Sequence, residues 1–294
     1  MTAMINHAPR WSHARGNAVV PSRWQATTYT GQSQAGWTIN GNSQYVVIGG
    51  EFPTANNKPQ QGLVRFAVSP ISPGKIGPEA NAALKPTIVS QSSGTARVAF
   101  QATWDRDDLN LTYKVFRNGN LTTPVYTTTT NSTFWNKPSL GFTDTGLTNG
   151  QTYSYRVFAY DALGNSTSTG SSLVTVSNAP GSAYVNKIKA DGASTLWRLG
   201  EASGAVAYDS VGFTDGVVGT AVTRGSAGSV IGETDTASNF DGTGESLVTS
   251  PSSSVGTDTF TIQSWIKTTT TSGGKILGFG NVITGLSSNY DRHL

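Results

Sequence analysis

The chain has 294 residues, of which 36% are hydrophobic and 13% are charged, and its net charge of +3 is thinly spread. The charged share is about half of the roughly 25% usual in globular domains, and no Lys/Arg cluster interleaves with aromatic residues, which argues against nucleic-acid binding. The lack of cysteine excludes disulfides and cysteine-ligated zinc, and no apolar run approaches the ~18 residues of a membrane helix. Ser, Thr, Gly and Asn replace the missing charges, and this composition predicts an all-β fold.

The first segment, residues 1–80, is predicted to hold a small antiparallel sheet. Short strands are expected at residues 37–39, 44–52 and 62–68, with the polar stretches NGNS and PTANNKPQ as turns. The phrase YVVIGGEFPTANNKPQQGLVRF resembles the last blade of a bacterial surface β-propeller. One blade cannot close a ring and the chain holds no second copy, so we expect the preceding blades to belong to a longer protein. Residues 69–86, rich in Pro and Gly, are predicted to be a linker.

The second segment, residues 85–177, shows the two-residue alternation that predicts strands with one buried face. In ARVAFQATW the positions that share a face are Val98, Phe100, Ala102 and Trp104, with Arg97, Gln101 and Thr103 opposite. In TYSYRVFAY the positions that share a face are Tyr153, Tyr155, Val157 and Ala159. Both stretches are therefore predicted to be strands with one buried face, and the second is interpreted as a structural strand rather than part of a site.

Leu147, Gly150 and Tyr153 have the spacing of a tyrosine corner, in which a tyrosine hydroxyl bonds back to the backbone of the preceding loop. With this corner and the strand pattern, residues 85–177 resemble a fibronectin type III domain from end to end. The resemblance implies a seven-stranded sandwich with Trp104 as the core tryptophan of its second strand. Asn149 stands where that family usually has proline, and asparagine suits the same turn.

The third segment, residues 183–294, contains the phrases TLWRLGEASG, AYDSVGFTDGVV, ASNFDGTGESLVTS and DTFTIQSWIKT. In this order and spacing they resemble a laminin-G-like jelly roll of the concanavalin A-like fold. Such a jelly roll needs about eight strands in two sheets, more than this segment supplies. We therefore expect the domain to be incomplete at its C-terminal end.

No complete catalytic constellation is found in the sequence. The histidines are His7, His13 and His293, all in terminal segments, so neither domain can build a Ser-His-Asp arrangement. In GETDTAS, Glu233 and Asp235 would share a strand face, as in the E-x-D-x-x-E pattern of concanavalin A-like glucanases. Ser238 stands where the third carboxylate should be, so a surface loop is the preferred interpretation and we predict no enzyme activity.

Calcium is the one cofactor that the sequence suggests. Asp209 and Asp215 lie in the Gly-containing loop YDSVGFTDG, and the laminin-G resemblance implies a calcium site near a sheet rim. The alternative is that both residues only form Asx-turns. The acidic stretch Asp105 to Asp108 is a weaker candidate, because an exposed turn explains it.

Aromatic residues offer a possible ligand surface. In FTIQSWIKT, Trp265 shares a face with Gln263 and Lys267, and a tryptophan among polar neighbours can stack on a sugar ring. The alternative is that Trp265 packs under a loop or against the other sheet. Phe134 and Trp135 are predicted to staple a loop.

The sequence thus predicts a fibronectin type III sandwich, a truncated concanavalin A-like jelly roll and a small N-terminal β remnant. We expect a non-catalytic fragment of a large exported bacterial protein that binds a glycan or a cell-surface or matrix protein, at an extracellular or cell-surface location. Two alternatives stay open, an accessory region of a secreted polysaccharide hydrolase and a purely structural stalk. Fold resemblance does not choose among them.

Overall fold

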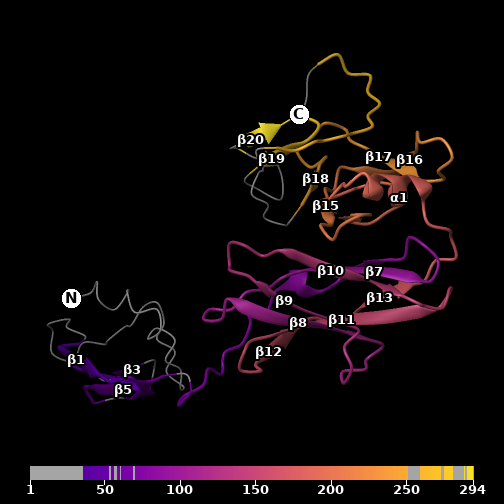
Figure 1. Cartoon of the computed structure of the whole chain (residues 1–294). Helices are drawn as coiled ribbons and strands as arrows, with labels where there is room; N and C mark the ends of the chain where they lie inside the picture. The colour runs from indigo at the N-terminus through magenta and orange to yellow at the C-terminus, as the bar shows by residue number, and fades with distance from the viewer. Residues whose placement is uncertain are drawn as a thin grey trace.

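The computed structural model describes residues 36–52, 54–55, 58–59, 61–68, 70–250, 259–272, 275–280, 288 and 290–293. Within these ranges the regular structure is antiparallel β-sheet, with one short α-helix and one turn of 3₁₀ helix (Figure 1). The all-β prediction is confirmed. None of the described helices is long and apolar enough to cross a membrane.

The N-terminal part forms the small antiparallel sheet that the sequence predicts. Its strand order is β1-β2-β5, with bounds Thr38–Gly41, Tyr45–Gly49 and Leu63–Ala67. The stretch predicted as a turn also carries a hairpin of β3 (Thr54–Ala55) and β4 (Lys58–Pro59). A small core unites Phe52, Ala55, Val64 and Phe66. The likeness to a propeller blade stays a prediction.

The middle part is a sandwich of two antiparallel sheets, preceded by a 3₁₀ turn (Ala82–Leu84). One sheet has the order β10-β7-β6, with bounds Ser139–Thr145, Thr95–Gln101 and Thr87–Val89. The other has the order β12-β11-β8-β9, with bounds Ser166–Ser168, Thr152–Tyr160, Asn110–Arg117 and Tyr126–Asn131, and β13 (Ser172–Thr175) also pairs with β11. Because β12 and β13 are two halves of one interrupted last strand, this is the three-plus-four strand order of a fibronectin type III domain.

The sandwich core follows the alternation read from the sequence. Its fully buried side chains come mainly from β7, β8 and β11, namely Ala96, Val98, Phe100, Leu111, Tyr113, Val115, Tyr155, Val157 and Ala159. Trp104 is an exception, because it lies beyond the end of β7 and outside this core cluster. The core aromatic rings in contact are instead those of Phe100 and Tyr113, with centroids 5.8 Å apart.

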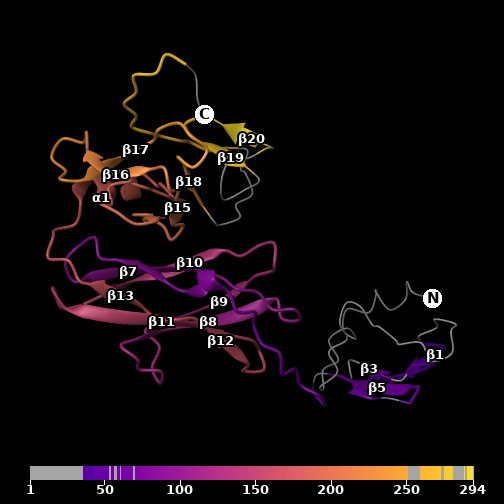
Figure 2. The ribbon, with the colours of Figure 1, turned by 180° about the vertical axis from the view of Figure 1, so that it is seen from behind.

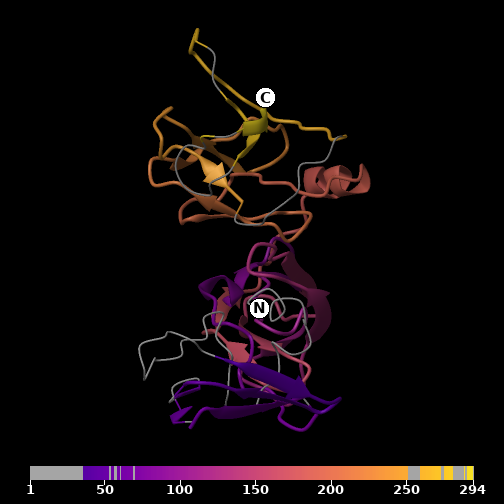
Figure 3. The same cartoon turned by 90° about the vertical axis from the view of Figure 1, so that its left-hand side faces the viewer.

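The outward face of β7 differs from the sequence prediction. Arg97 was expected on the face opposite the core, yet it is buried. The cause is the third part of the chain, which lies against this sheet in all three views (Figures 1, 2 and 3). Arg97 donates from Nε to the carbonyl of Gly212 at 2.7 Å, and its guanidinium lies over the Phe213 ring. Gly141 is required here, because a Cβ at this position would lie 2.3 Å from the Phe213 ring.

The tyrosine corner is present. The backbone N–H of Thr148 donates to the Tyr153 hydroxyl at 3.1 Å, as the spacing predicted. Asn149, which replaces the usual proline, accepts from the Gly94 N–H at 2.7 Å and donates to the Ser93 hydroxyl at 2.7 Å. The asparagine therefore ties this loop to the turn before β7, which proline could not do.

The third part begins with a helix that the sequence analysis missed, α1 (Ala183–Ala190), capped by the Ser182 hydroxyl. The described strands after it are β14 (Val206–Ala207), β15 (Gly216–Val218), β16 (Thr223–Ala227), β17 (Thr236–Asn239), β18 (Val248–Thr249), β19 (Gly278–Gly280) and β20 (Tyr290–His293). They pair as β14-β15-β18, β16-β17 and β19-β20. The likeness to a laminin-G jelly roll stays a prediction.

Candidate functional site

Three loops meet at one end of the sandwich. They join β7 to β8 (residues 102–109), β9 to β10 (132–138) and β11 to β12 (161–165). The strand registers bring them together, because the end of β7 pairs with the start of β10 and the start of β8 with the end of β9. We call this region the loop end. Loops carried on a rigid β-scaffold are where binding residues usually lie.

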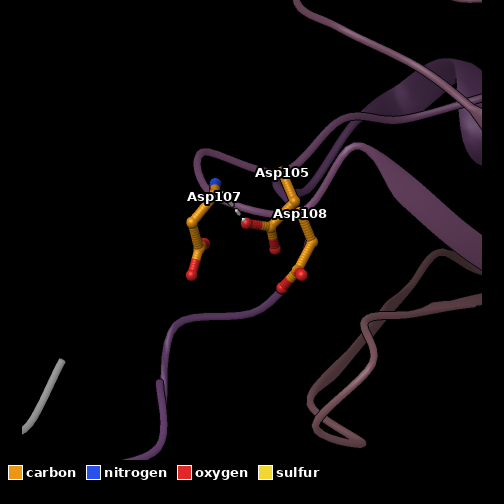
Figure 4. Close-up of side chains that lie close together, drawn as sticks. All are labelled: Asp105, Asp107 and Asp108. Carbon is orange, nitrogen blue, oxygen red and sulfur yellow. Dashed lines mark hydrogen bonds between the residues drawn. The ribbon is translucent and has the colours of Figure 1, made fainter. Parts of the chain in front are cut away.

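Three carboxylates of the first loop converge. Asp105, Asp107 and Asp108, called the acidic triad below, place carboxylate oxygens that all lie within 4.8 Å of one another. Figure 4 shows the Asp105 carboxylate between those of the other two. Asp105 is buried, whereas the other two are half-buried. The sequence gives these residues only as a weak metal candidate, because it cannot show that the loop folds their side chains inward.

The loop that carries the triad is held by hydrogen bonds. The Asp107 N–H donates to Asp105 Oδ1 at 3.0 Å, and Thr103, which is buried, donates to the carbonyl of Glu79. The Tyr113 hydroxyl donates to the Thr103 carbonyl at 2.9 Å, and burial raises the pKa of this hydroxyl. Arg106 Nε lies 2.8 Å from Glu79 Oε1, so the cation within the loop is engaged outside the triad.

Aromatic side chains gather at the same end. Trp104 meets Phe134 edge-on with ring centroids 5.8 Å apart, and Phe134 meets Trp135 at 4.4 Å. These three residues, called the aromatic group below, contact one another as the predicted staple would. Phe134 and Trp135 are nevertheless 61% and 66% exposed. Exposed apolar surface of this kind usually marks a binding surface when it forms a contiguous patch.

The ligand surface predicted around Trp265 lies on an extended stretch that forms no ladder within the described residues. Gln263 and Lys267 are exposed, and Trp265 is 78% exposed. Ile266, on the opposite face of the same stretch, is 60% exposed as well. Ligand binding by these residues stays a prediction.

The predicted calcium ligand Asp209 is fully buried and surrounded by backbone donors. Its Oδ1 accepts from the N–H groups of Leu196, Val211 and Gly212 at 2.9–3.1 Å, and its Oδ2 accepts from Thr214 at 3.1 Å. This is the turn-forming role that the sequence analysis left open.

Asp215 is engaged by the neighbouring sandwich. Its Oδ1 lies 2.8 Å from Nη2 of Arg97 and accepts from the Asp209 N–H at 2.8 Å. Its Oδ2 accepts from the Thr87 hydroxyl at 2.5 Å. A cation between Asp209 and Asp215 would have to displace these donors. Calcium binding here stays a prediction.

Glu233 and Asp235 lie in the loop before β17, as predicted, and both pair with Arg198. The distances are 2.9 Å from Arg198 Nη2 to Glu233 Oε2 and 2.6 Å from Nε to Asp235 Oδ2. A hydrogen bond from the Ser182 hydroxyl and the Arg198 guanidinium lower the pKa of Glu233. A glycosidase acid needs a raised pKa, so this carboxylate is tuned in the opposite direction.

A polar cleft of about 360 Å³ lies beside the contact between the β7 sheet and the third part of the chain, and both parts line it. The sequence alone does not reveal this cleft, because its walls come from segments far apart in the chain. Its charged lining residues include Arg97, Arg198, Glu201 and Asp235. Each of these four has an ion-pair partner, whereas Lys189, which also lines the cleft, has no ion pair among the described residues.

Comparison with known proteins gives weak similarities only. No protein-family model matches the chain, and no curated protein matches it. Among solved structures, the sixth fibronectin type III domain of human fibronectin type III domain containing protein 3 is 17% identical, with a TM-score of 0.28, over 37% of this chain and 95% of that one.

A redesigned β-sandwich protein is 16% identical with a TM-score of 0.25, over 36% of this chain and 95% of that one. A β-1,2-glucanase from Parabacteroides distasonis is 13% identical with a TM-score of 0.23, over 43% of this chain and 17% of that one. These likenesses add nothing about what the chain binds. The strand order of the middle part stands by itself, and it is that of a fibronectin type III-like β-sandwich.

Proposed function

We propose that the chain is a non-catalytic, ligand-binding region of a larger extracellular bacterial protein, and that its ligand is a glycan. The observation that carries the proposal is the exposure of the aromatic group at the loop end. Trp135 and Phe134 leave most of their ring area in water although both already contact another ring. Exposed aromatic rings lose hydration favourably when an apolar face, such as the C–H face of a sugar, covers them.

The surroundings of these rings also suit a sugar. The loop that carries Phe134 and Trp135 otherwise consists of Ser132, Thr133, Asn136 and Lys137 before Pro138. Ligand sites combine an apolar wall with a few polar groups that fix orientation, and this loop supplies both within a few residues. The exposed Trp265, with Gln263 and Lys267, is proposed as a second contact for an extended glycan.

The absence of catalysis is part of the proposal. Among the described residues, the carboxylate pair most similar to a glycosidase motif, Glu233 and Asp235, is held in ion pairs by Arg198. The lowered pKa of Glu233 leaves this residue without the proton that a general acid must donate at neutral pH.

The test is a glycan array probed with the full chain and with single variants. Trp135→Ala should weaken binding about tenfold or more, a loss of roughly 1.4 kcal/mol. Trp37→Ala is the matched control, because Trp37 is similarly exposed but precedes β1 in the N-terminal sheet. Trp265→Ala tests the second contact separately.

Two outcomes would overturn this proposal. If the wild-type chain retains no glycan, the glycan assignment is wrong, and a protein ligand or a structural stalk replaces it. If Trp135→Ala and Trp265→Ala both bind as tightly as wild type, the ligand does not use these aromatic residues.

A further inference from the structure

We propose that the acidic triad, Asp105, Asp107 and Asp108, is a calcium site. The proposal does not depend on the ligand of the aromatic group, and it assigns the metal to a different place from Asp209 and Asp215. It rests on the convergence of the three carboxylates and on the state of Asp105 (Figure 4).

The main observation in favour of a bound cation is the environment of the Asp105 carboxylate. The residue is only 7% exposed and its Oδ1 accepts the N–H of Asp107, whereas its Oδ2 is buried without a hydrogen-bond partner in the part of the chain that the structure describes. Buried carboxylate oxygens without a partner are costly, and most polar groups in protein interiors are satisfied. A cation between the carboxylates would satisfy Oδ2 and reduce the repulsion among three negative charges.

The donor set selects the type of cation. All three side chains offer oxygen, which suits hard cations such as Ca²⁺ and Mg²⁺ rather than soft transition metals. Calcium binds oxygen at about 2.3–2.6 Å, so two oxygens on opposite sides of one ion lie at most about 5 Å apart. The triad oxygens, within 4.8 Å of one another, fit around a single calcium ion. Mg²⁺ binds fewer carboxylates and keeps its waters, so three converging carboxylates favour calcium.

The loop also holds its shape without the metal. Trp104, just before the triad, accepts at its carbonyl from the Glu79 N–H at 2.9 Å, and Thr103 is fixed from both sides by Glu79 and Tyr113. The same Glu79 side chain engages Arg106. A preformed loop loses little conformational freedom on binding, which favours affinity.

The contrast with Asp209 supports this choice. Four backbone N–H groups already satisfy the Asp209 carboxylate, whereas one oxygen of Asp105 has no hydrogen-bond partner among the described residues. Both aspartates are buried, so burial alone does not separate them. The two residues differ in the number of hydrogen-bond donors around each carboxylate.

The experiment is isothermal titration of CaCl₂ into the full, chelator-treated chain. We expect one bound calcium with a Kd of about 0.1–1 mM, the range of extracellular modules. Asp105→Asn and Asp108→Asn should each weaken binding about tenfold or more, since ligand charge sets the affinity. MgCl₂ titrated in the same way should give weaker binding.

Matched variants keep the test decisive. Asp105→Asn preserves an oxygen for the Asp107 N–H, and melting curves in chelator check that each variant is folded. Asp191→Asn is the control, because it removes an exposed carboxylate at the end of α1 and should leave calcium affinity unchanged. If Asp105→Asn does not fold, Asp108→Asn decides. No calcium binding by wild type at about 10 mM, or wild-type affinity in Asp108→Asn, would overturn the proposal.

Discussion

Single aspartates in this chain differ by what surrounds them rather than by their sequence context. Asp105 and Asp209 both follow an aromatic residue and both precede a turn. Asp209 is enclosed by backbone donors, whereas Asp105 turns one oxygen toward two other carboxylates. The same residue type therefore shapes a loop in one place and forms a candidate cation site in the other.

We predict that Asp209→Ala destabilises the chain by about 2–4 kcal/mol even in the presence of chelator, because several buried N–H groups lose their acceptor at once. Urea unfolding followed by tryptophan fluorescence measures this effect. Asp191→Ala, at an exposed position, should change the free energy of unfolding by less than about 0.5 kcal/mol. An Asp209→Ala variant as stable as wild type in chelator would contradict the turn-forming role.

Glu233 gives a pH-dependent prediction. Its pKa is lowered from 4.5 in the folded state, first by the Ser182 hydroxyl and then by Arg198. A lowered folded-state pKa contributes stability that is complete above the unfolded value and is lost as the pH falls through the folded value. The stability difference between wild type and Glu233→Gln should therefore be present at pH 7 and shrink below pH 4.5. A difference that is constant across this range would contradict the assignment, and turnover of β-glucans abolished by the same variant would contradict the non-catalytic proposal.

At the scale of elements, the two sheets of the sandwich are joined by polar contacts as well as by apolar packing. Asp144 on β10 accepts from the Tyr155 hydroxyl on β11 at 2.8 Å and from Arg117 on β8 at 2.9 Å. Burial, followed by the Asp144 carboxylate, raises the pKa of Tyr155 above its ordinary value of 10.0. The tyrosine thus stays a hydrogen-bond donor at all ordinary pH values.

Two tyrosines of β11 form a matched pair for a stability test. Tyr155→Phe should lower the free energy of unfolding by about 1–3 kcal/mol, because the Asp144 carboxylate loses a donor at a part-buried position. Tyr153→Phe removes the hydrogen bond of the tyrosine corner, but that bond is exposed and water can replace it. We therefore expect a smaller shift of the urea midpoint for Tyr153→Phe. Equal shifts for the two variants would contradict this ranking.

At the scale of the whole molecule, the ion pair between Arg97 and Asp215 joins the sandwich to the third part of the chain. The two side chains are 8% and 10% exposed, and 2.8 Å separates their charged atoms. Thr87 and Gln91 add hydrogen bonds across the same joint, to Asp215 and Ser210. A contact of this kind fixes the two parts relative to each other.

We predict that Arg97→Ala uncouples the unfolding of the two parts. Removing one partner of a buried pair costs about 3–5 kcal/mol, because the remaining charge is left without compensation. Calorimetry should show one main transition for these two parts in wild type and two in the variant. Lys187→Ala removes an exposed pair and should leave the trace unchanged. If Arg97→Ala unfolds like wild type, the joint does not couple the parts.

The sequence by itself determined the strands of the sandwich and the tyrosine corner. Alternation of apolar residues with a period of two reports directly which face of a strand is buried, and the hydrogen bond of the tyrosine corner joins Thr148 and Tyr153, only five residues apart. The positions of Val98, Phe100, Val157 and Ala159 in the core followed from this local pattern. The loop position of Glu233 and Asp235 also followed from their polar neighbours.

Only the tertiary structure decided which polar groups are satisfied and which surfaces are covered. Arg97 was expected to face water, and it is buried because Gly212, 115 residues away in sequence, supplies its acceptor. Trp104 was expected in the core, but the strand ends before it and it joins the aromatic group instead. The acidic triad looked like an ordinary exposed turn. Burial and hydrogen-bond satisfaction depend on contacts between distant segments, and a local sequence pattern does not contain them.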